Sequence, residues 1–243
     1  MAQNIVIYQD EGVGEFGLTC LREFFRDDSV RLADADTVRE GTVLENADIF
    51  VMPGGADLPY CRKLNGKGNA NIRNFVENGG TYLGICAGAY YACKALEFHK
   101  GRADEISGHR ELALADAVAY GSLPEIAPYY DMTLKSAGLV KLNISGKSAR
   151  FFYHGGPAFR LENNETNVLA CYEGFGKNPP AIIKTRVGSG HAVLLGVHAE
   201  MTSQNMGGYP AKGNEKEILK HIIARMSQDS TDTHGILRDL LRV

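Results

Sequence analysis

The sequence contains no tryptophan, no excess of charge of either sign and no long apolar run. Its 26 Lys and Arg residues nearly balance its 29 Asp and Glu residues, so the formal net charge of the 243-residue chain is −3 at pH 7. Such a balance is not typical of surfaces that bind nucleic acid or anionic membranes. The longest apolar runs also fall short of the ~18 residues of a membrane span. We therefore expect neither nucleic acid nor a membrane as a partner.

Cysteine is scarce, and its spacing excludes two common uses. The five cysteines are odd in number and include no Cys-x-x-Cys pair, which argues against a disulfide framework and against a zinc site. The amino-terminal residues lack the basic stretch of a secretory signal. We therefore expect a cytoplasmic protein that holds no metal ion and no other cofactor.

Apolar runs alternate with helical periods over the first ~95 residues. Strands are expected at 4–8, 30–33, 47–52 and 81–86, and helices near 15–26, 72–76 and 87–92. This alternation predicts a parallel sheet with helices on both faces. Strand character returns at 168–172, 181–185 and 192–197, before amphipathic helices at 215–226 and 234–241.

The stretch 99–165 has a different character, with short β-like runs broken by Gly, Pro and Ser. We interpret it as a β-rich insertion or excursion within one domain that spans residues 1–243. Candidate site residues lie both before and after it, so both ends of the chain must build the same sheet.

One cysteine lies in a motif that carries chemistry. The run 84–88, Gly-Ile-Cys-Ala-Gly, has the form of a nucleophile elbow, in which a strand turns sharply into a helix. The flanking glycines avoid Cβ clashes in that turn. The helix amino terminus favours the thiolate of Cys86, and the N–H of Ala87 is placed to donate to an oxyanion. The alternative is a small cysteine that is buried at a glycine-rich turn only for packing.

A thiolate nucleophile needs a base, and the base needs an orienting group. His198 follows the apolar run 192–197, and Glu200 comes two residues later, where its carboxylate can fix the imidazole tautomer. After another apolar run, the glycines of Pro53-Gly54-Gly55 can present a second oxyanion N–H, at Gly54 or Gly55. A strand-capping histidine, a surface glutamate and an ordinary glycine-rich turn are the alternatives.

In this order, these three motifs resemble the class I glutamine amidotransferase-like superfamily. More closely, residues 52–93 are similar to the family related to the N-terminal region of eukaryotic biotin-protein ligases. The resemblance implies a flavodoxin-like, three-layer α/β/α fold with a mostly parallel sheet. It also implies a Cys–His–Glu triad at Cys86, His198 and Glu200, with an oxyanion hole at the amides of Gly54, Gly55 and Ala87.

Two departures from these families bear on function. Working glutaminases usually have Gln four residues after the nucleophile, where this sequence has Tyr90, which weakens the case for glutamine as the substrate. The sequence also lacks the Gly/Arg-rich loop with which biotin ligases bind biotinyl-adenylate. We therefore do not expect this chain to be a biotin ligase itself.

Four residues are candidates for substrate binding. Asp57 and Tyr60 follow the glycine turn and line a pocket unless they begin a solvated helix. Tyr90 lines the site unless it packs in the core. His154 follows the run 150–153 and enters the site unless it only belongs to a turn.

These observations favour a cysteine-dependent amide or ester hydrolase, or acyl transferase, that acts on a small molecule or a peptide end. A separate protein partner or a homo-oligomer is compatible with this function. The alternatives are a catalytically weak or inactive binding and regulatory module on the same fold, and a redox-active thiol protein.

Overall fold

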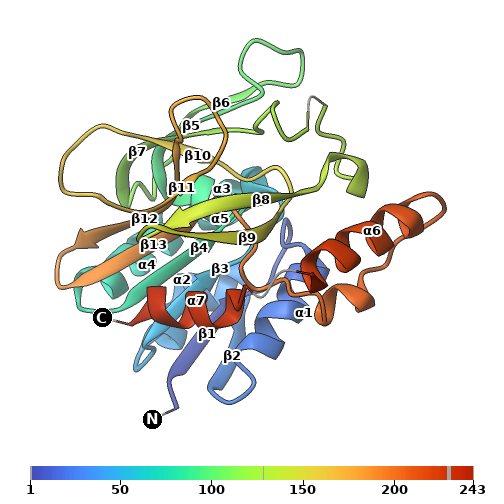
Figure 1. Ribbon diagram of the computed structural model, residues 1–243. Coiled ribbons are helices and arrows are strands. Elements are labelled where there is room, and N and C mark those ends of the chain that lie inside the picture. The colour runs from blue at the N-terminus through green and yellow to red at the C-terminus, as the bar shows by residue number, and fades with distance from the viewer. Residues whose placement is uncertain (1, 128, 229–230, 243) are drawn as a thin grey trace.

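The computed structural model describes residues 2–127, 129–228 and 231–242, and a nine-stranded sheet runs through it (Figure 1). Five parallel strands follow one another across the sheet: β2 (Ser29–Ala33), β1 (Asn4–Tyr8), β3 (Ile49–Met52), β4 (Thr81–Ile85) and β13 (Gly190–Leu195). Antiparallel strands extend it in the order β12 (Pro180–Val187), β11 (Asn167–Tyr172), β8 (Gly138–Ile144) and β9 (Lys147–Tyr153).

Helices cover both faces of the parallel strands, which explains why β3 and β4 are buried on both sides. Successive residues point to opposite faces, so Ile5 and Ile7 of β1 join one core and Val6 and Tyr8 join the other. The first core includes side chains of α1 (Glu15–Phe24) and α7 (Thr233–Leu241). The second includes side chains of α2 (Ala35–Glu40), α3 (Asp57–Leu64), α4 (Lys67–Glu77) and α5 (Ala87–Ala92).

A second sheet packs against α5 on the side away from the main sheet, at the top of Figure 1. Its four strands have the order β10 (Ala158–Leu161), β7 (Ala115–Gly121), β5 (Cys93–Phe98) and β6 (Ile106–His109). Leu96 and Ala117 join it to the core of the α2–α5 layer. A third, smaller core lies under α6 (Glu215–Ser227) and includes Leu219 and Phe152.

The predicted fold class is confirmed, since the expected strands and helices are present and the sheet has a parallel core. The stretch 99–165 is divided between the two sheets, because β6, β7 and β10 build the second sheet whereas β8 and β9 form the edge of the main one. That it belongs to one domain spanning 1–243 stays a prediction. The sequence analysis did not identify α2, α3 or β5.

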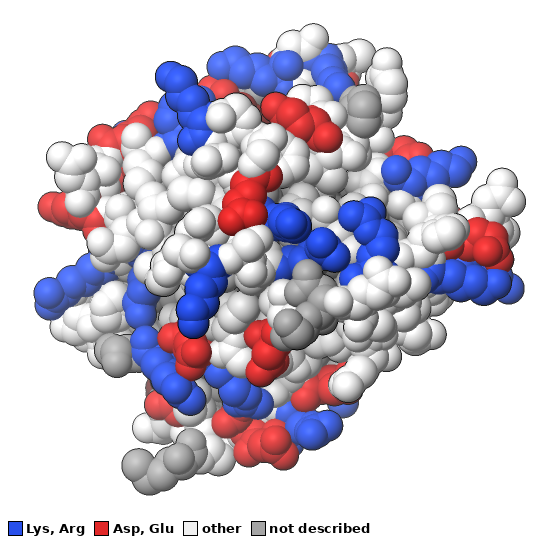
Figure 2. All heavy atoms as spheres, in the orientation of Figure 1, with Lys and Arg blue, Asp and Glu red and all other residues white. Residues whose placement is uncertain are grey.

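Acidic and basic side chains are interspersed on the face shown in Figure 2, in keeping with the near-balanced charge of the chain. Within the described ranges, no helix is both long enough and apolar enough to cross a membrane.

We expect Gly88→Ala to destabilise the fold, because an added Cβ would lie 2.1 Å from the carbonyl oxygen of Met52. Overpacking of this kind typically costs about 1–3 kcal/mol. Gly207→Ala is the matched control, since nothing lies within 4 Å of a Cβ at that position. Urea unfolding measures both variants, and equal free energies of unfolding for the two would contradict this account of the packing.

Candidate active site

The motifs singled out from the sequence meet at the carboxyl ends of three neighbouring parallel strands. β3 pairs with β4, and β4 pairs with β13. The turn 53–55 follows β3, Cys86 follows β4, and His198 lies three residues beyond the end of β13. The carboxyl edge is where open parallel sheets place their ligand sites.

Cys86 has a strained backbone between β4 and α5. Its φ of 50° and ψ of −106° lie in a region that L-residues with a Cβ rarely adopt. The turn is held on both sides, because the N–H of Cys86 donates to the carbonyl of Leu195 (2.9 Å) and the N–H of Gly88 donates to that of Pro53 (3.1 Å). A Cβ on Gly84 would lie 2.6 Å from the carbonyl oxygen of Gly88, so glycine is required there.

The backbone amides around Cys86 are free to receive an anion. Within residues 2–127, 129–228 and 231–242, no atom accepts a hydrogen bond from the N–H of Gly54, Gly55 or Ala87. The glycine turn is itself fixed, since the carbonyl of Gly54 accepts from the N–H of Gly14 at 2.9 Å. At Gly55, φ is +141° and a Cβ would lie 1.9 Å from a backbone oxygen, so only glycine fits.

His198 and Glu200 form a buried hydrogen-bonded pair. The distance from His198 Nδ1 to Glu200 Oε1 is 2.8 Å, and the side chains are 7% and 1% exposed. This bond leaves Nε2 as the imidazole nitrogen available for a substrate or for Cys86. His198 and Cys86 both border Gly54, where a Cβ would lie 2.9 Å from His198 Cε1 and 3.4 Å from the Cβ of Cys86.

The thiol of Cys86 donates to the carbonyl oxygen of His154, at 3.6 Å from Sγ. The side chain of His154 is directed elsewhere, with its Nε2 3.3 Å from the hydroxyl of Ser136. His154 therefore contacts Cys86 through its backbone rather than through its imidazole.

The two histidines near Cys86 have opposite electrostatic environments. Burial opposes the charge on His198, but the carboxylate of Glu200 and the Cys86 side chain outweigh it and raise the pKa of His198 to about 10. Burial and the neighbouring His198 lower the pKa of His154 to about 4. Of these two histidines, only His198 favours the imidazolium form at neutral pH. This form suits His198 for donating a proton.

Residues that the sequence analysis missed hold Glu200 in place. Its backbone carbonyl accepts from Asn205 Nδ2 (2.8 Å) and lies 3.0 Å from His234 Nε2. Its carboxylate oxygen Oε2 is buried and has no partner among the described residues. His234 belongs to α7, so the C-terminal helix supports the site from a segment without a motif of its own.

A pocket of about 320 Å³ opens beside Cys86. Its wall includes five residues predicted for the site: Gly55, Asp57, Cys86, Ala87 and Tyr90. Most of the remaining wall is apolar and comes from α3, from the second sheet and from the loop before η2 (Leu134–Ser136). Arg62 of α3, which follows the same turn as Asp57, also lies in the wall. The wall residues of the second sheet were not predicted, because nothing in their spacing indicates that this sheet folds over the elbow.

The four predicted substrate-binding residues have different surroundings. Asp57 lines the pocket but is ion-paired with the buried Arg110, at 2.6 Å. Tyr90 also lines it, and its hydroxyl donates to the carbonyl of Gly155 (3.2 Å). Tyr60 lies fully buried beneath the glycine turn and donates to the carbonyl of Pro53 (3.2 Å). His154 contributes its carbonyl oxygen to the thiol, as described above.

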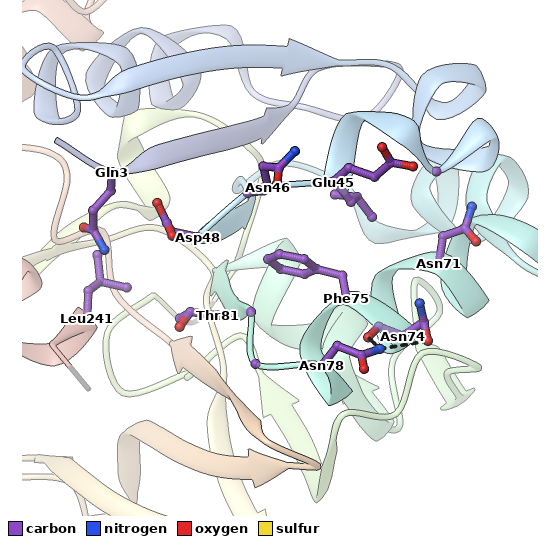
Figure 3. Close-up of a pocket in the computed structure, with 15 residues that line it drawn as sticks. Gln3, Glu45, Asn46, Asp48, Asn71, Asn74, Phe75, Asn78, Thr81 and Leu241 are labelled. Carbon is purple, nitrogen blue, oxygen red and sulfur yellow. Dashed lines mark hydrogen bonds between the residues drawn. The ribbon is translucent and has the colours of Figure 1, made fainter.

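A larger hollow of about 530 Å³ lies at the opposite, amino-terminal edge of the parallel strands (Figure 3). Amide and carboxylate side chains surround Phe75 there, and Asn78 donates to Asn74. The described residues that line this hollow include no cysteine and no histidine, so it lacks the reactive groups found beside Cys86.

Comparison with known proteins identifies relatives over almost the whole chain. Residues 3–243 match the family model described as "Biotin-protein ligase, N terminal". An uncharacterized protein of Chlamydia muridarum is 33% identical over 209 residues, which cover 82% of this chain and 80% of that protein. The biotin–protein ligase of Schizosaccharomyces pombe is 29% identical over 241 residues, which cover 90% of this chain but only 37% of that enzyme.

Solved structures with similar folds include two from Thermotoga maritima. A glutamine amidotransferase has a TM-score of 0.61 at 15% identity, with 99% of this chain and 97% of that chain covered. PurLQS has a TM-score of 0.58 at 13% identity, with 93% and 99% covered. At these identities the likeness shows a shared fold, which is the glutamine amidotransferase-like, flavodoxin-type fold.

The raised pKa of His198 predicts a pH-dependent contribution to stability. His198 titrates near 6.5 when unperturbed and at about 10 in the folded protein. Its contribution is therefore fully present below about pH 6.5 and is lost as the pH rises through about 10. Glu200→Gln removes the charge that favours the imidazolium. We therefore expect this variant to have a lower free energy of unfolding than the wild type, with the difference largest near about pH 6 and smaller toward about pH 10.

Urea unfolding over this pH range checks the expectation, with Glu165→Gln at an exposed carboxylate as the control. A destabilisation by Glu200→Gln that does not change with pH would contradict it.

Removing one partner of the buried pair of Asp57 and Arg110 should cost far more stability than removing one partner of the exposed pair of Glu11 and Arg62. The side chains are 11% and 7% exposed in the first pair and 56% and 60% in the second. Asp57→Asn leaves a buried guanidinium unpaired and should cost about 3–5 kcal/mol. Glu11→Gln should cost at most about 1 kcal/mol. Chemical denaturation compares the two, and a similar cost for both would show that the Asp57–Arg110 pair is not buried as described.

Proposed function

Because the chain belongs to the family of the biotin-protein ligase N-terminal region and has a glutamine amidotransferase-like fold, we propose that it is a cysteine-dependent amide or ester hydrolase or acyl transferase. Cys86 is the nucleophile, His198 carries the proton and Glu200 orients His198. The amides of Ala87 and of Gly54 or Gly55 form the oxyanion hole. The substrate is a small molecule or a peptide end.

In the first step, the thiolate of Cys86 attacks the carbonyl carbon of the substrate. A C–S bond forms while the carbonyl electron pair moves onto oxygen, where the free backbone amides stabilise the negative charge. When the carbonyl re-forms, the bond to the amine or alcohol breaks, and the imidazolium of His198 protonates the leaving group. A thioester on Cys86 and a neutral His198 remain.

In the second step, water attacks the thioester carbonyl, and His198 takes the proton that the water loses. The C–S bond breaks, the acid is released, and the thiolate and imidazolium are restored. In a transferase reaction, an acceptor amine or alcohol replaces water. The side chain of Glu200 accepts the hydrogen bond from His198 Nδ1 and supports the imidazolium whenever His198 is charged.

One juxtaposition carries this proposal: a cysteine with a strained backbone adjoins free backbone amides and a buried His–Glu pair. Strained φ/ψ values at non-glycine residues concentrate at functional sites. Cys86 and the His198–Glu200 pair come from segments more than a hundred residues apart. The 2.8 Å bond between His198 and Glu200 is the geometry that an oriented base requires. A cysteine buried only for packing needs neither the free amides nor the oriented histidine.

Biotin transfer by this chain alone is not part of the proposal. The chain spans 37% of the S. pombe ligase that it matches. Its sequence lacks the Gly/Arg-rich loop expected for biotinyl-adenylate. In an amidotransferase reaction, a separate protein partner would use the released ammonia. We propose a cytoplasmic setting for the reaction, where the thiol stays reduced.

Alkylation by a low concentration of iodoacetamide near neutral pH tests the nucleophile. Cys86 should react faster than the other cysteines, and Cys86→Ala should abolish this fast phase and lower hydrolysis of an amide and ester panel by at least about 10³-fold. Cys171→Ala is the control, because Cys171 is the partly exposed cysteine on a distant strand.

Equal alkylation rates in the wild type and in Cys86→Ala would contradict an activated thiol. Fast alkylation of Cys86 without Cys86-dependent turnover of any panel member would contradict the enzyme proposal and favour the binding module.

A further inference from the structure

The pocket beside Cys86 has a largely apolar wall. Leu58 of α3, Leu96 and Phe98 of β5, Ile106 of β6 and Met132 all line it. Both the α2–α5 layer and the second sheet thus contribute to the wall, which also includes Cys86 and Ala87. The acyl group of a substrate whose carbonyl carbon meets Cys86 would lie among these side chains.

The charged side chains of the wall are already paired. Asp57 is matched by Arg110, and Arg62 by Glu11 at 2.8 Å. Binding glutamine would require partners for an ammonium, a carboxylate and an amide, so it would compete with these pairs. Burying polar groups of a ligand without new hydrogen-bond partners is unfavourable. An apolar group needs no such partners, so the existing ion pairs of the wall do not oppose its binding.

The ring of Tyr90, close to the elbow, belongs to an aromatic cluster. This ring meets Phe98 edge-on, with centroids 5.8 Å apart, and Phe98 meets Tyr130 at 5.6 Å in the same way. His99 stacks on the same Phe98 ring at 4.1 Å. The hydroxyl of Tyr90 donates a hydrogen bond to the carbonyl of Gly155, so only the ring of Tyr90 is available to contact a ligand. Such a fixed aromatic surface suits an apolar ligand.

The pocket has an apolar rim as well. Leu58 is 41% exposed and Met132 is 68% exposed, and both are among the few large apolar side chains that reach solvent in the described part of the chain. Single exposed apolar residues need no explanation, but these two border the same pocket that holds Cys86. An apolar ligand would cover them and remove their surface from water.

The volume of the pocket leaves room for a short hydrocarbon chain. A pocket of about 320 Å³ corresponds to roughly ten water volumes of about 30 Å³ each. Because a methylene group and a water molecule are similar in size, the pocket holds roughly ten non-hydrogen atoms.

We propose that the acyl group transferred to Cys86 is apolar, and that its amides, esters or thioesters are the substrates rather than glutamine. This inference rests on the proposed function, because it takes Cys86 as the attacking atom. The covalent step is the one given above: the C–S bond forms, the bond to the leaving group breaks, and His198 protonates the leaving group.

Alkylation of the protein by N-hexyl iodoacetamide and by iodoacetamide tests the pocket without requiring turnover. At Cys86 the hexyl reagent should react at least about tenfold faster, because its chain is buried in the pocket. At Cys171 the two reagents should react at similar rates. Peptide mapping by mass spectrometry gives the rate at each cysteine.

Leu58→Asp and Met132→Asp place a carboxylate at the rim and should reduce the preference for the hexyl reagent at Cys86 about threefold or more. Val168→Asp is the matched control, because Val168 is also 41% exposed and lies outside this pocket. The control should keep the wild-type preference. The rim positions are exposed, so these variants should fold, and circular dichroism verifies it.

The outcomes separate the two proposals. If neither reagent alkylates Cys86 rapidly, the proposed function is wrong. If both alkylate it rapidly and at equal rates, or if Val168→Asp lowers the preference as much as Leu58→Asp, Cys86 is reactive but the apolar acyl pocket is wrong. A preference for the hexyl reagent that only the rim variants reduce supports the inference.

Discussion

The close approach between the start of α5 and the ends of β3 and β4 is the constraint on which this site depends. Gly88 donates to the carbonyl of Pro53 and leaves no room for a Cβ against Met52, and Cys86 is bound to the end of β13. These contacts hold Cys86 at a φ of 50°. Without them the residue would relax, and its neighbouring amide would pair with the backbone as in an ordinary turn. Parallel pairing of the three strands then places the glycine turn and His198 around the same point.

Much of this arrangement is predictable from the sequence, because it depends on local patterns. Apolar runs identify the buried strands, and the glycines at 84 and 88 identify a turn that only glycine permits. The position of His198 follows from the rule that parallel strands end at one edge. In contrast, α3 begins with Asp57 and has a weakly apolar pattern, and β5 continues α5 without a turn signal at Cys93. Local propensity does not indicate these two elements.

The residues that could not be predicted are those whose roles come from tertiary contacts. Arg110 is one basic residue among 26 Lys and Arg until the fold buries it beside Asp57. His234 supports Glu200 from the last helix, and Phe98 reaches the elbow only because the second sheet folds over α5. The same contacts determine the role of Tyr90. In the sequence it is a departure from the glutaminase pattern, whereas in the fold its ring is packed against Phe98 as one wall of an apolar pocket. The proposed cysteine chemistry and a substrate other than glutamine are therefore compatible in one site.

The central claim is that Cys86 forms a thioester during turnover. Rapid acid quenching after mixing with p-nitrophenyl hexanoate, followed by peptide mapping, tests it most directly. The account predicts a hexanoyl adduct on the peptide that contains Cys86, which hydroxylamine removes and which is absent from Cys86→Ala. An adduct on another residue, or release of p-nitrophenol by the protein without any adduct on Cys86, would contradict it.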